Sequence, residues 1–210
     1  GSDSYIGNVY LKNKEILAIT HGEVISSDIS IDATGKIVTP GFIDLHSHSD
    51  FSFLLDSTAQ SKLRQGVTME LLGNCGFSLC APLNKYTKED FDSWISEYTD
   101  TFDITWSDFG GYIAASKKAK ATINLAFQVG HGTLRASVMG YEDRTPSADE
   151  LDKMKNLAGE CLDAGALGLS TGLVYSPGTY SRTDELISIA EEVSKRNKLY
   201  STHQRDEGND

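Results

Sequence analysis

A chain of 210 residues with 39% apolar and 23% charged residues is long enough to bury a hydrophobic core, which excludes a disordered protein. Its formal net charge of -11 excludes a nucleic-acid partner, because phosphate binding requires clustered lysine and arginine. The first residues, GSDSYIG, do not resemble a secretory signal, and no later window approaches the length of a membrane span. We therefore expect a soluble protein without a membrane partner.

The cysteines indicate a reducing compartment. Cys75, Cys80 and Cys161 are odd in number and follow no disulfide spacing, so they are predicted to be free thiols. We accordingly expect a cytoplasmic protein. Cys161 falls on the apolar side of a predicted helix and is assigned to the core.

The first predicted unit covers residues 1–38 and consists of short strands. Apolar segments at residues 5–11, 15–20 and 31–38 are separated by Asn, Lys, Gly and Asp. This pattern is typical of antiparallel strands joined by tight turns. Residues 1–38 are therefore expected to form a small β unit.

From residue 39 onwards, apolar strands alternate with amphipathic helices. Strands are predicted in the apolar run of residues 39–50 and in residues 66–73, 121–130, 165–172 and 199–203. Helices are predicted for residues 57–65, 88–99 and 107–119 and for two segments that begin near Ser147 and Ser181. Ser147 with Glu150 fits a capping box, and Ser181 with Asp184 fits a second helix start.

This alternation predicts a parallel α/β sheet covered by helices, arranged either as a doubly wound sheet or as a (β/α)8 barrel. Polar residues follow the predicted strands at their C-terminal ends, namely His46, His48, Cys75, His131, Tyr175 and His203. In a barrel all of these ends converge on one mouth. No strand-to-helix turn carries a glycine-rich phosphate fingerprint, so we predict a TIM-type barrel of which residues 39–210 supply about five βα units.

The segment TPGFIDLHSHSD, residues 39–50, ends in two histidines one residue apart. On an extended strand His46 and His48 point to the same face. Two imidazoles in one cavity repel each other when both are protonated and leave unsatisfied ring nitrogens when both are neutral. A divalent cation resolves both problems, so we predict a metal site. Asp44 either accepts from an imidazole N–H or is simply a strand-end residue.

Other strand-end residues add to this hypothesis. The segment GNCG presents Cys75 either as a thiolate ligand or as a small buried apolar group. His203 ends the fifth strand and is the next candidate ligand. His131 belongs either to the site or to a tight structural loop, and Arg135 anchors either that loop or a substrate carboxylate. Tyr175 either hydrogen-bonds a substrate or packs within its loop.

Five segments occur in order along the chain: VTPGFIDLHSHSD, LRQGVTMELLGNCGFS, QVGHGTLR, GALGLSTGLVYSPGTYSRTDEL and STHQRDEG. Together they resemble the N-acyl-D-amino-acid deacylase, or D-aminoacylase, branch of the amidohydrolase superfamily. The resemblance implies a metal-dependent (β/α)8 barrel beside a small β-sandwich, of which residues 1–38 would be a portion.

The resemblance also implies roles for single residues. Cys75 and His203 would hold a tightly bound zinc ion. His46 and His48 would belong to a second, weaker metal position, and Tyr175 would contact the substrate carboxylate. Many cyclic-amide hydrolases of the superfamily instead use a carboxylated lysine after the fourth strand, whereas residues 164–194 contain no lysine. A dihydroorotase-like or hydantoinase-like cyclic-amide hydrolase is the alternative.

We therefore expect the full-length protein to hydrolyse the amide bond of a small-molecule substrate, an N-acyl-D-amino acid, giving a carboxylate and a free D-amino acid. Five units do not close an eight-stranded barrel. By resemblance, a further histidine ligand and the aspartate that acts as general base would lie beyond Asp210. We expect the chain to be part of a longer protein and, on its own, an inactive truncated module.

Overall fold

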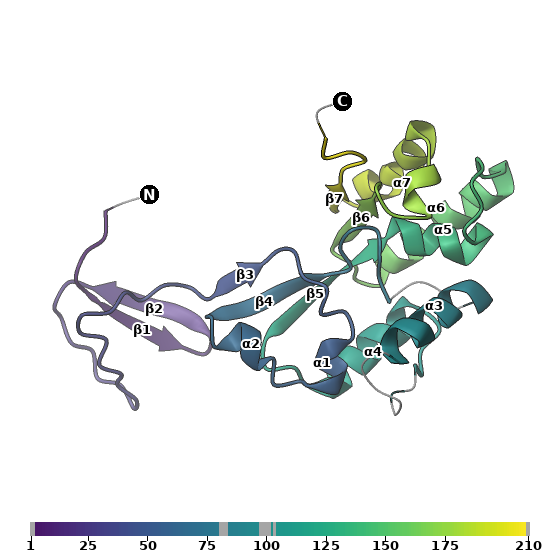
Figure 1. Cartoon of the computed structure of the whole chain (residues 1–210). Coiled ribbons are helices and arrows are strands. Elements are labelled where there is room, and N and C mark those ends of the chain that lie inside the picture. Colours follow the sequence, from purple (N-terminus) through teal and green to yellow (C-terminus); the bar gives the residue numbers. More distant parts are fainter. Residues whose placement is uncertain (1–2, 80–83, 97–101, 103, 209–210) are drawn as a thin grey trace. The chain divides into compact units, whose positions relative to one another are not determined.

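The structure is a computed structural model that describes residues 3–79, 84–96, 102 and 104–208. The chain divides into two compact units, Gly1–Pro40 and Gly41–Asp210, and each is described by itself (Figure 1). Among the described residues, no helix combines the length and the apolar character needed to cross a membrane.

The first unit contains a β-hairpin. Strand β1 (Asn8–Lys12) pairs antiparallel with β2 (Glu15–Thr20). The chain reverses at Asn13 and Lys14, which both have positive φ, as two-residue hairpin turns require. β2 coincides with the predicted segment of residues 15–20, and β1 ends one residue beyond the predicted residues 5–11. That the unit is a portion of a β-sandwich stays a prediction.

The third predicted segment of this unit, residues 31–38, is not a strand. The Asp32 carboxylate accepts the backbone N–H of Thr34 at 2.9 Å, which closes a local turn in place of a strand. Ile37 is 91% exposed, so its side chain packs on no described neighbour. Apolar alternation was therefore insufficient to form a strand without a partner to pair with.

The second unit contains a five-stranded sheet in which every neighbouring pair is parallel. Its strands are β3 (Phe42–Asp44), β4 (Val67–Leu72), β5 (Asn124–Gly130), β6 (Gly168–Gly172) and β7 (Leu199–His203). Their order in the sheet equals their order in the chain. A doubly wound sheet reverses its order at a switch point, whereas a barrel wall does not. The second unit is thus about half of a TIM-type barrel, which confirms the predicted fold class.

Helices connect the strands of this half-barrel (Figure 1). They are α1 (Ser52–Leu55), α2 (Gln60–Leu63), α3 (Lys85–Ser96), α4 (Phe109–Ala119), α5 (His131–Met139), α6 (Ala148–Asp163) and α7 (Thr183–Lys195), with a short 3-10 helix η1 (Gly178–Tyr180). α3 begins before the predicted residue 88, and the predicted residues 97–99 lie outside the described part of the chain. The helix predicted for residues 57–65 is shortened to α2, because Ala59 takes a left-handed conformation with φ 45°.

The two predicted helix starts had different outcomes. Ser147 caps α6: its hydroxyl accepts the N–H of Glu150 at 3.3 Å, and the Glu150 carboxylate accepts the N–H of Ser147 at 2.8 Å. The prediction for Ser181 was wrong. α7 begins at Thr183, and the Ser181 hydroxyl donates to the carbonyl of Gly178 at 2.6 Å, which stabilises the preceding loop instead.

The core lies between the sheet and its helices. β5 contributes Val129 and β6 contributes Leu169, while helices contribute Tyr112, Met154 and Leu162, all almost fully buried. The predicted core residue Cys161 is 4% exposed. The helices therefore pack on the outer face of the sheet and leave the C-terminal strand ends free to carry a site.

Candidate metal centre

The predicted metal ligands gather around the sulfur of Cys75. Its Sγ lies 3.2 Å from Nε2 of His46 and 3.5 Å from Nδ1 of His203. The rings of His46 and His48 have centroids 5.4 Å apart, and one ligand atom each of His46, His48 and Cys75 lie within 4.8 Å of one another. β3 ends at Asp44, so both histidines lie just after the strand and not on it.

These spacings fit a zinc site. A sulfur and a nitrogen ligand of one tetrahedral zinc ion lie about 3.5 Å apart, because Zn–S and Zn–N bonds are about 2.3 and 2.0 Å. Both ring nitrogens lie within reach of the sulfur, at 3.2 and 3.5 Å, and the tautomer of each imidazole decides which atom donates. One thiolate with several imidazoles is also a donor set that suits zinc. The ligand assignment stays a prediction that this geometry supports.

Burial favours the neutral forms of Cys75 and His48. Burial raises the pKa of the Cys75 thiol. Burial and the charge of His46 lower the pKa of His48. A neutral imidazole is ready to bind a metal, whereas the thiol has to release its proton on binding.

Cys75 lies in a tight loop directly after β4, with φ +54° in the left-handed region. The Ser170 hydroxyl on β6 donates to the carbonyl of Gly73 and accepts the N–H of Gly76 at 3.0 Å. Gly73 itself has φ +76°, and a Cβ there would lie 2.1 Å from the carbonyl oxygen of Gln128. Neighbouring strands thus force the unusual conformation that presents the thiol.

Asp50 also holds this loop and was not identified from the sequence. It is 1% exposed, and its Oδ1 accepts the N–H of Gly73 at 2.9 Å. Burial raises the pKa of this carboxyl to about 7, although the bond to Gly73 opposes the shift. The sequence signal was its place at the end of HSHSD, two residues after His48.

A buried carboxylate holds the serines that alternate with the two histidines. Glu70 of β4 accepts the hydroxyl of Ser47 at 2.9 Å and that of Ser49 at 3.3 Å, and its charge pairs with Lys62 at 2.8 Å. Because alternate side chains of an extended segment point in opposite directions, anchoring the serines turns the histidines away from Glu70. Sequence reasoning missed Glu70, since nothing local indicates its burial.

Asp44 does not contact an imidazole ring. One of its oxygens accepts the backbone N–H of His46 at 3.2 Å, and the other binds Lys62 Nζ at 2.6 Å. The hydrogen bond from Lys62 contributes most to lowering the pKa of this carboxyl. Asp44 therefore closes the strand end, the second of its two expected roles.

Tyr175 lies beside the site. It follows β6, its ring centroid is 5.0 Å from that of His203 in an edge-on arrangement, and it is 50% exposed. This places a phenol next to a predicted ligand, where a substrate can reach it. Its contact with a substrate carboxylate stays a prediction.

His131 and Arg135 belong to a separate, fully buried cluster. His131 Nε2 lies 2.9 Å from one oxygen of Glu185, and Arg135 donates to the other at 2.6 Å. Arg135 also donates to the carbonyl of Arg144 at 2.6 Å, so it anchors the loop after α5. His131 begins α5 and does not lie in the expected tight loop. Of the alternatives left open, these contacts favour the structural one for both residues.

A cavity of about 580 Å³ adjoins the predicted ligands. His48, Cys75 and Tyr175 line it together with Phe77, Phe91 and Trp94. The ring of Phe77 packs edge-on against Phe91 at 5.5 Å and Trp94 at 5.3 Å between centroids. The mouth of the half-barrel thus carries an aromatic wall next to the predicted metal ligands.

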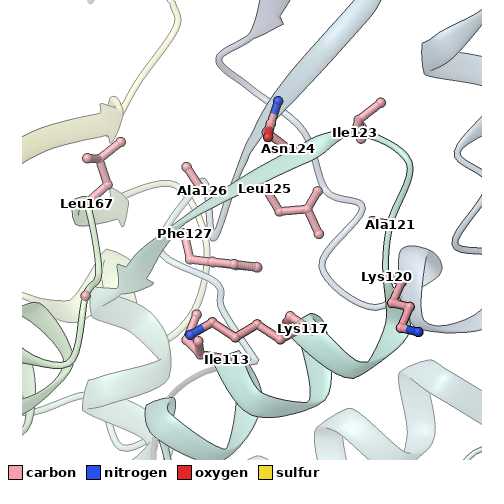
Figure 2. A pocket seen from close by; sticks show the side chains of 12 residues that line it. Ile113, Lys117, Lys120, Ala121, Ile123, Asn124, Leu125, Ala126, Phe127 and Leu167 are labelled. Atoms are coloured by element: carbon pink, nitrogen blue, oxygen red, sulfur yellow. The ribbon is translucent and has the colours of Figure 1, made fainter. Parts of the chain in front are cut away.

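A second cavity of about 460 Å³ lies between α4 and the N-terminal half of β5 (Figure 2). Ile113 and Lys117 approach it from the helix, and Leu125 and Phe127 from the strand. It contains none of the predicted site residues. The chemistry therefore belongs to the cavity at the opposite strand ends.

Comparisons with known proteins agree with the geometry. Residues 30–195 match the model of the Amidohydrolase family. A D-aminoacylase of Alcaligenes xylosoxydans xylosoxydans is 35% identical over 198 residues, which are 94% of this chain and 40% of that protein. The chain therefore spans about two fifths of the length of this curated relative.

Two solved structures have the same fold. One, described for the binuclear metal centre of D-aminoacylase, superimposes with a TM-score of 0.83 at 34% identity and covers 99% of this chain and 43% of its own. The other is N-acyl-D-glutamate deacylase from Bordetella bronchiseptica in complex with zinc and a phosphonate inhibitor. Its TM-score is 0.79 at 34% identity, with coverage of 92% of this chain and 40% of that one.

Proposed function

Because the chain belongs to the amidohydrolase family, we propose that the whole protein is a zinc-dependent hydrolase of N-acyl-D-amino acids that releases a carboxylate and a free D-amino acid. The observation that carries the proposal is the thiol of Cys75 between the imidazoles of His46 and His203, at the C-terminal strand ends. The relatives named D-aminoacylase and N-acyl-D-glutamate deacylase support the substrate class.

In this proposal, Cys75 and His203 hold a tightly bound zinc ion, and His46 and His48 belong to a second, weaker position. Zinc supplies a Lewis acid that polarises the scissile carbonyl and lowers the pKa of water. Cys75 contributes the negative charge that histidines alone lack. Its loop, fixed by Ser170, keeps the sulfur in place.

The remaining roles fall to groups around the cavity. In this proposal the phenol of Tyr175 donates a hydrogen bond to the substrate carboxylate and orients the amide toward the ligands, which its position beside His203 supports. An aspartate outside this chain would accept the proton of the attacking water and pass it to the leaving amine. The aromatic wall excludes water from one side of the reacting amide.

The cavity also supports a substrate preference. Its wall is aromatic at Phe77, Phe91 and Trp94, and the carboxylate of Asp90 lines it as well. An apolar substituent is stabilised there by burial, whereas an acidic side chain is repelled by Asp90. We therefore expect N-acyl derivatives of apolar D-amino acids to be better substrates than those of D-glutamate or D-aspartate.

The test uses the whole protein loaded with zinc. Release of free amino acid is followed for N-acetyl derivatives of D-leucine, D-phenylalanine, D-glutamate and L-leucine, with hydantoin and dihydroorotate as cyclic-amide controls. We expect the highest kcat/KM for the apolar D substrates. Turnover of cyclic amides alone would refute the proposal, and a higher kcat/KM for D-glutamate would refute the preference.

A further inference from the structure

A chain of buried side-chain hydrogen bonds crosses the inner side of the half-barrel. Asn74 Nδ2 donates to the carbonyl of Ser47 at 3.1 Å. Gln128 Nε2 donates to Asn74 Oδ1 at 3.2 Å, and Gln128 Oε1 accepts the hydroxyl of Ser201 at 2.9 Å. Gln128 thus uses both ends of its amide to join the loop after β4 to β7.

This row of side-chain hydrogen bonds connects the segments that carry the predicted ligands. Ser47 stands between the two histidines after β3, Asn74 directly precedes Cys75, and Ser201 lies two residues before His203. The glutamine on β5 is adjacent to none of these ligands. It connects the segment of Cys75 to that of His203 through its bonds to Asn74 and Ser201.

The backbone alone connects these segments only indirectly. In the sheet, β5 and β6 lie between β4, which precedes Cys75, and β7, which ends in His203. Small displacements in each strand pair therefore add up between the two ligands. A direct side-chain link across the strands removes this freedom.

Burial makes the link specific. Asn74 is 3% and Gln128 1% exposed, so their amides depend on partners within the protein. Each Gln128 bond has a fixed direction, because its nitrogen only donates and its carbonyl oxygen only accepts. Phe127 and Val129, which flank Gln128 on β5, point to the other face of the sheet and pack into the hydrophobic core.

We propose that Gln128, with Asn74, is a positioning residue that holds the ligand-bearing strand ends at the spacing a zinc ion requires. The inference rests on the proposed zinc site. Partners that orient metal ligands typically change metal affinity roughly 10- to 100-fold when removed. Gln128 would act one step further out, through the segments that carry Cys75 and His203.

The first test is Gln128→Met in the whole protein, which keeps the side-chain length and removes both hydrogen bonds. Zinc affinity is measured by competition with a chelator, and the absorption spectrum of the cobalt-substituted protein reports the geometry around the thiolate. We expect affinity to fall roughly 10-fold or more and the cobalt bands to change. A cobalt spectrum and zinc affinity equal to wild type in the folded variant would overturn the proposal.

A milder variant covers the case in which Gln128→Met fails to fold. Ser201→Ala removes only the hydrogen bond from the Ser201 hydroxyl to Gln128 Oε1. Its matched control is Ser116→Ala on α4, which removes one buried hydroxyl bond, to the carbonyl of Tyr112 at 2.8 Å, away from the site. We expect similar melting temperatures for both, but weaker zinc binding and altered cobalt bands only for Ser201→Ala.

The outcomes separate this inference from the proposed function. Equal zinc affinity and equal cobalt spectra in Ser201→Ala and Ser116→Ala would overturn the positioning role, even in an active deacylase. Conversely, a wild-type protein that binds zinc but hydrolyses no N-acyl-D-amino acid contradicts the function and leaves the comparison of variants intact. A wild-type protein that binds no zinc overturns both.

Discussion

The proposed site depends on one residue, Cys75. It contacts His46 and His203, which are far from it in the chain. Its positive φ is uncommon for a residue with a side chain and costs about 1–3 kcal/mol. Strain at a thiol held between two imidazoles favours a ligand over a packing residue.

Substituting Cys75 by alanine tests that role. Cys75→Ala removes the anionic donor, so we expect loss of the tightly bound zinc and of hydrolysis, with little loss of thermal stability in the metal-free protein. Zinc content by elemental analysis and kcat/KM are the measurements.

Cys161→Ala is the matched control, because this thiol is buried in the helical core, where burial raises its pKa to about 12. It should retain zinc and activity. Retention of zinc and activity in Cys75→Ala would contradict the ligand assignment.

At the scale of elements, the contacts of one buried carboxylate hold two helices together behind the site. His131 and Arg135 of α5 both bind Glu185 of α7. Burial on its own raises the pKa of Glu185, but hydrogen bonds and charge from His131 and Arg135 outweigh it and the net pKa is lowered. This carboxylate therefore ties two helices together in its ionised form.

We predict a pH-dependent loss of stability for Glu185→Gln. At pH 7 the free energy of unfolding should fall by about 3 kcal/mol, because Arg135 remains buried without its partner. Since the folded pKa is lowered, the contribution of Glu185 is complete above the unfolded pKa of about 4.3 and disappears as pH falls through the folded pKa. The gap between variant and wild type should thus shrink below about pH 4.

Denaturant unfolding at several pH values measures this gap. Glu191→Gln, on the exposed side of the same helix, is the control and should stay close to wild type throughout. A gap for Glu185→Gln that widens on acidification would show that the carboxylate is not stabilised in its charged form.

The N-terminal cap of α6 gives a second prediction at this scale. Ser147→Ala removes the hydroxyl that accepts the Glu150 N–H and should lower the free energy of unfolding by about 1 kcal/mol. Ser188→Ala serves as the control. It removes a hydroxyl of α7 that donates to the backbone carbonyl of Asp184. Equal stability of the two variants in urea would exclude a capping contribution.

At the scale of the whole molecule, the two outer strands of the sheet determine how the 210 residues are expected to behave on their own. The five-stranded sheet has β3 and β7 as its outer strands, whereas a closed barrel has no such edges. The chain also covers 40% of the D-aminoacylase that it matches. Within the described residues, β3 and β7 therefore lie at open edges of the sheet.

We predict that these 210 residues, produced alone, are inactive and self-associate. Open strand edges pair with other chains, and zinc held by an incomplete donor set is bound weakly. Light scattering, zinc content and an amidase assay measure the three properties. A monomer that holds one zinc ion and hydrolyses N-acetyl-D-leucine would refute this prediction.

The fold class and the candidate ligands follow from the sequence alone. Alternating strands and helices predict the parallel sheet, Ser147 with Glu150 predicts the capping box that the structure confirms, and the motifs single out His46, His48, Cys75 and His203 as candidate ligands. These features depend on short-range periodicity and on residue type, which a single sequence carries.

Which side chains meet follows from the assembled fold. That Gln128 links Asn74 to Ser201, that Glu70 holds the serines and that Glu185 binds His131 are contacts between residues far apart in the chain. Residues 31–38 have the apolar pattern of a strand but do not form one, because a strand also needs a neighbouring strand to pair with. Burial and pairing are properties of the assembled sheet, so no local pattern could reveal them.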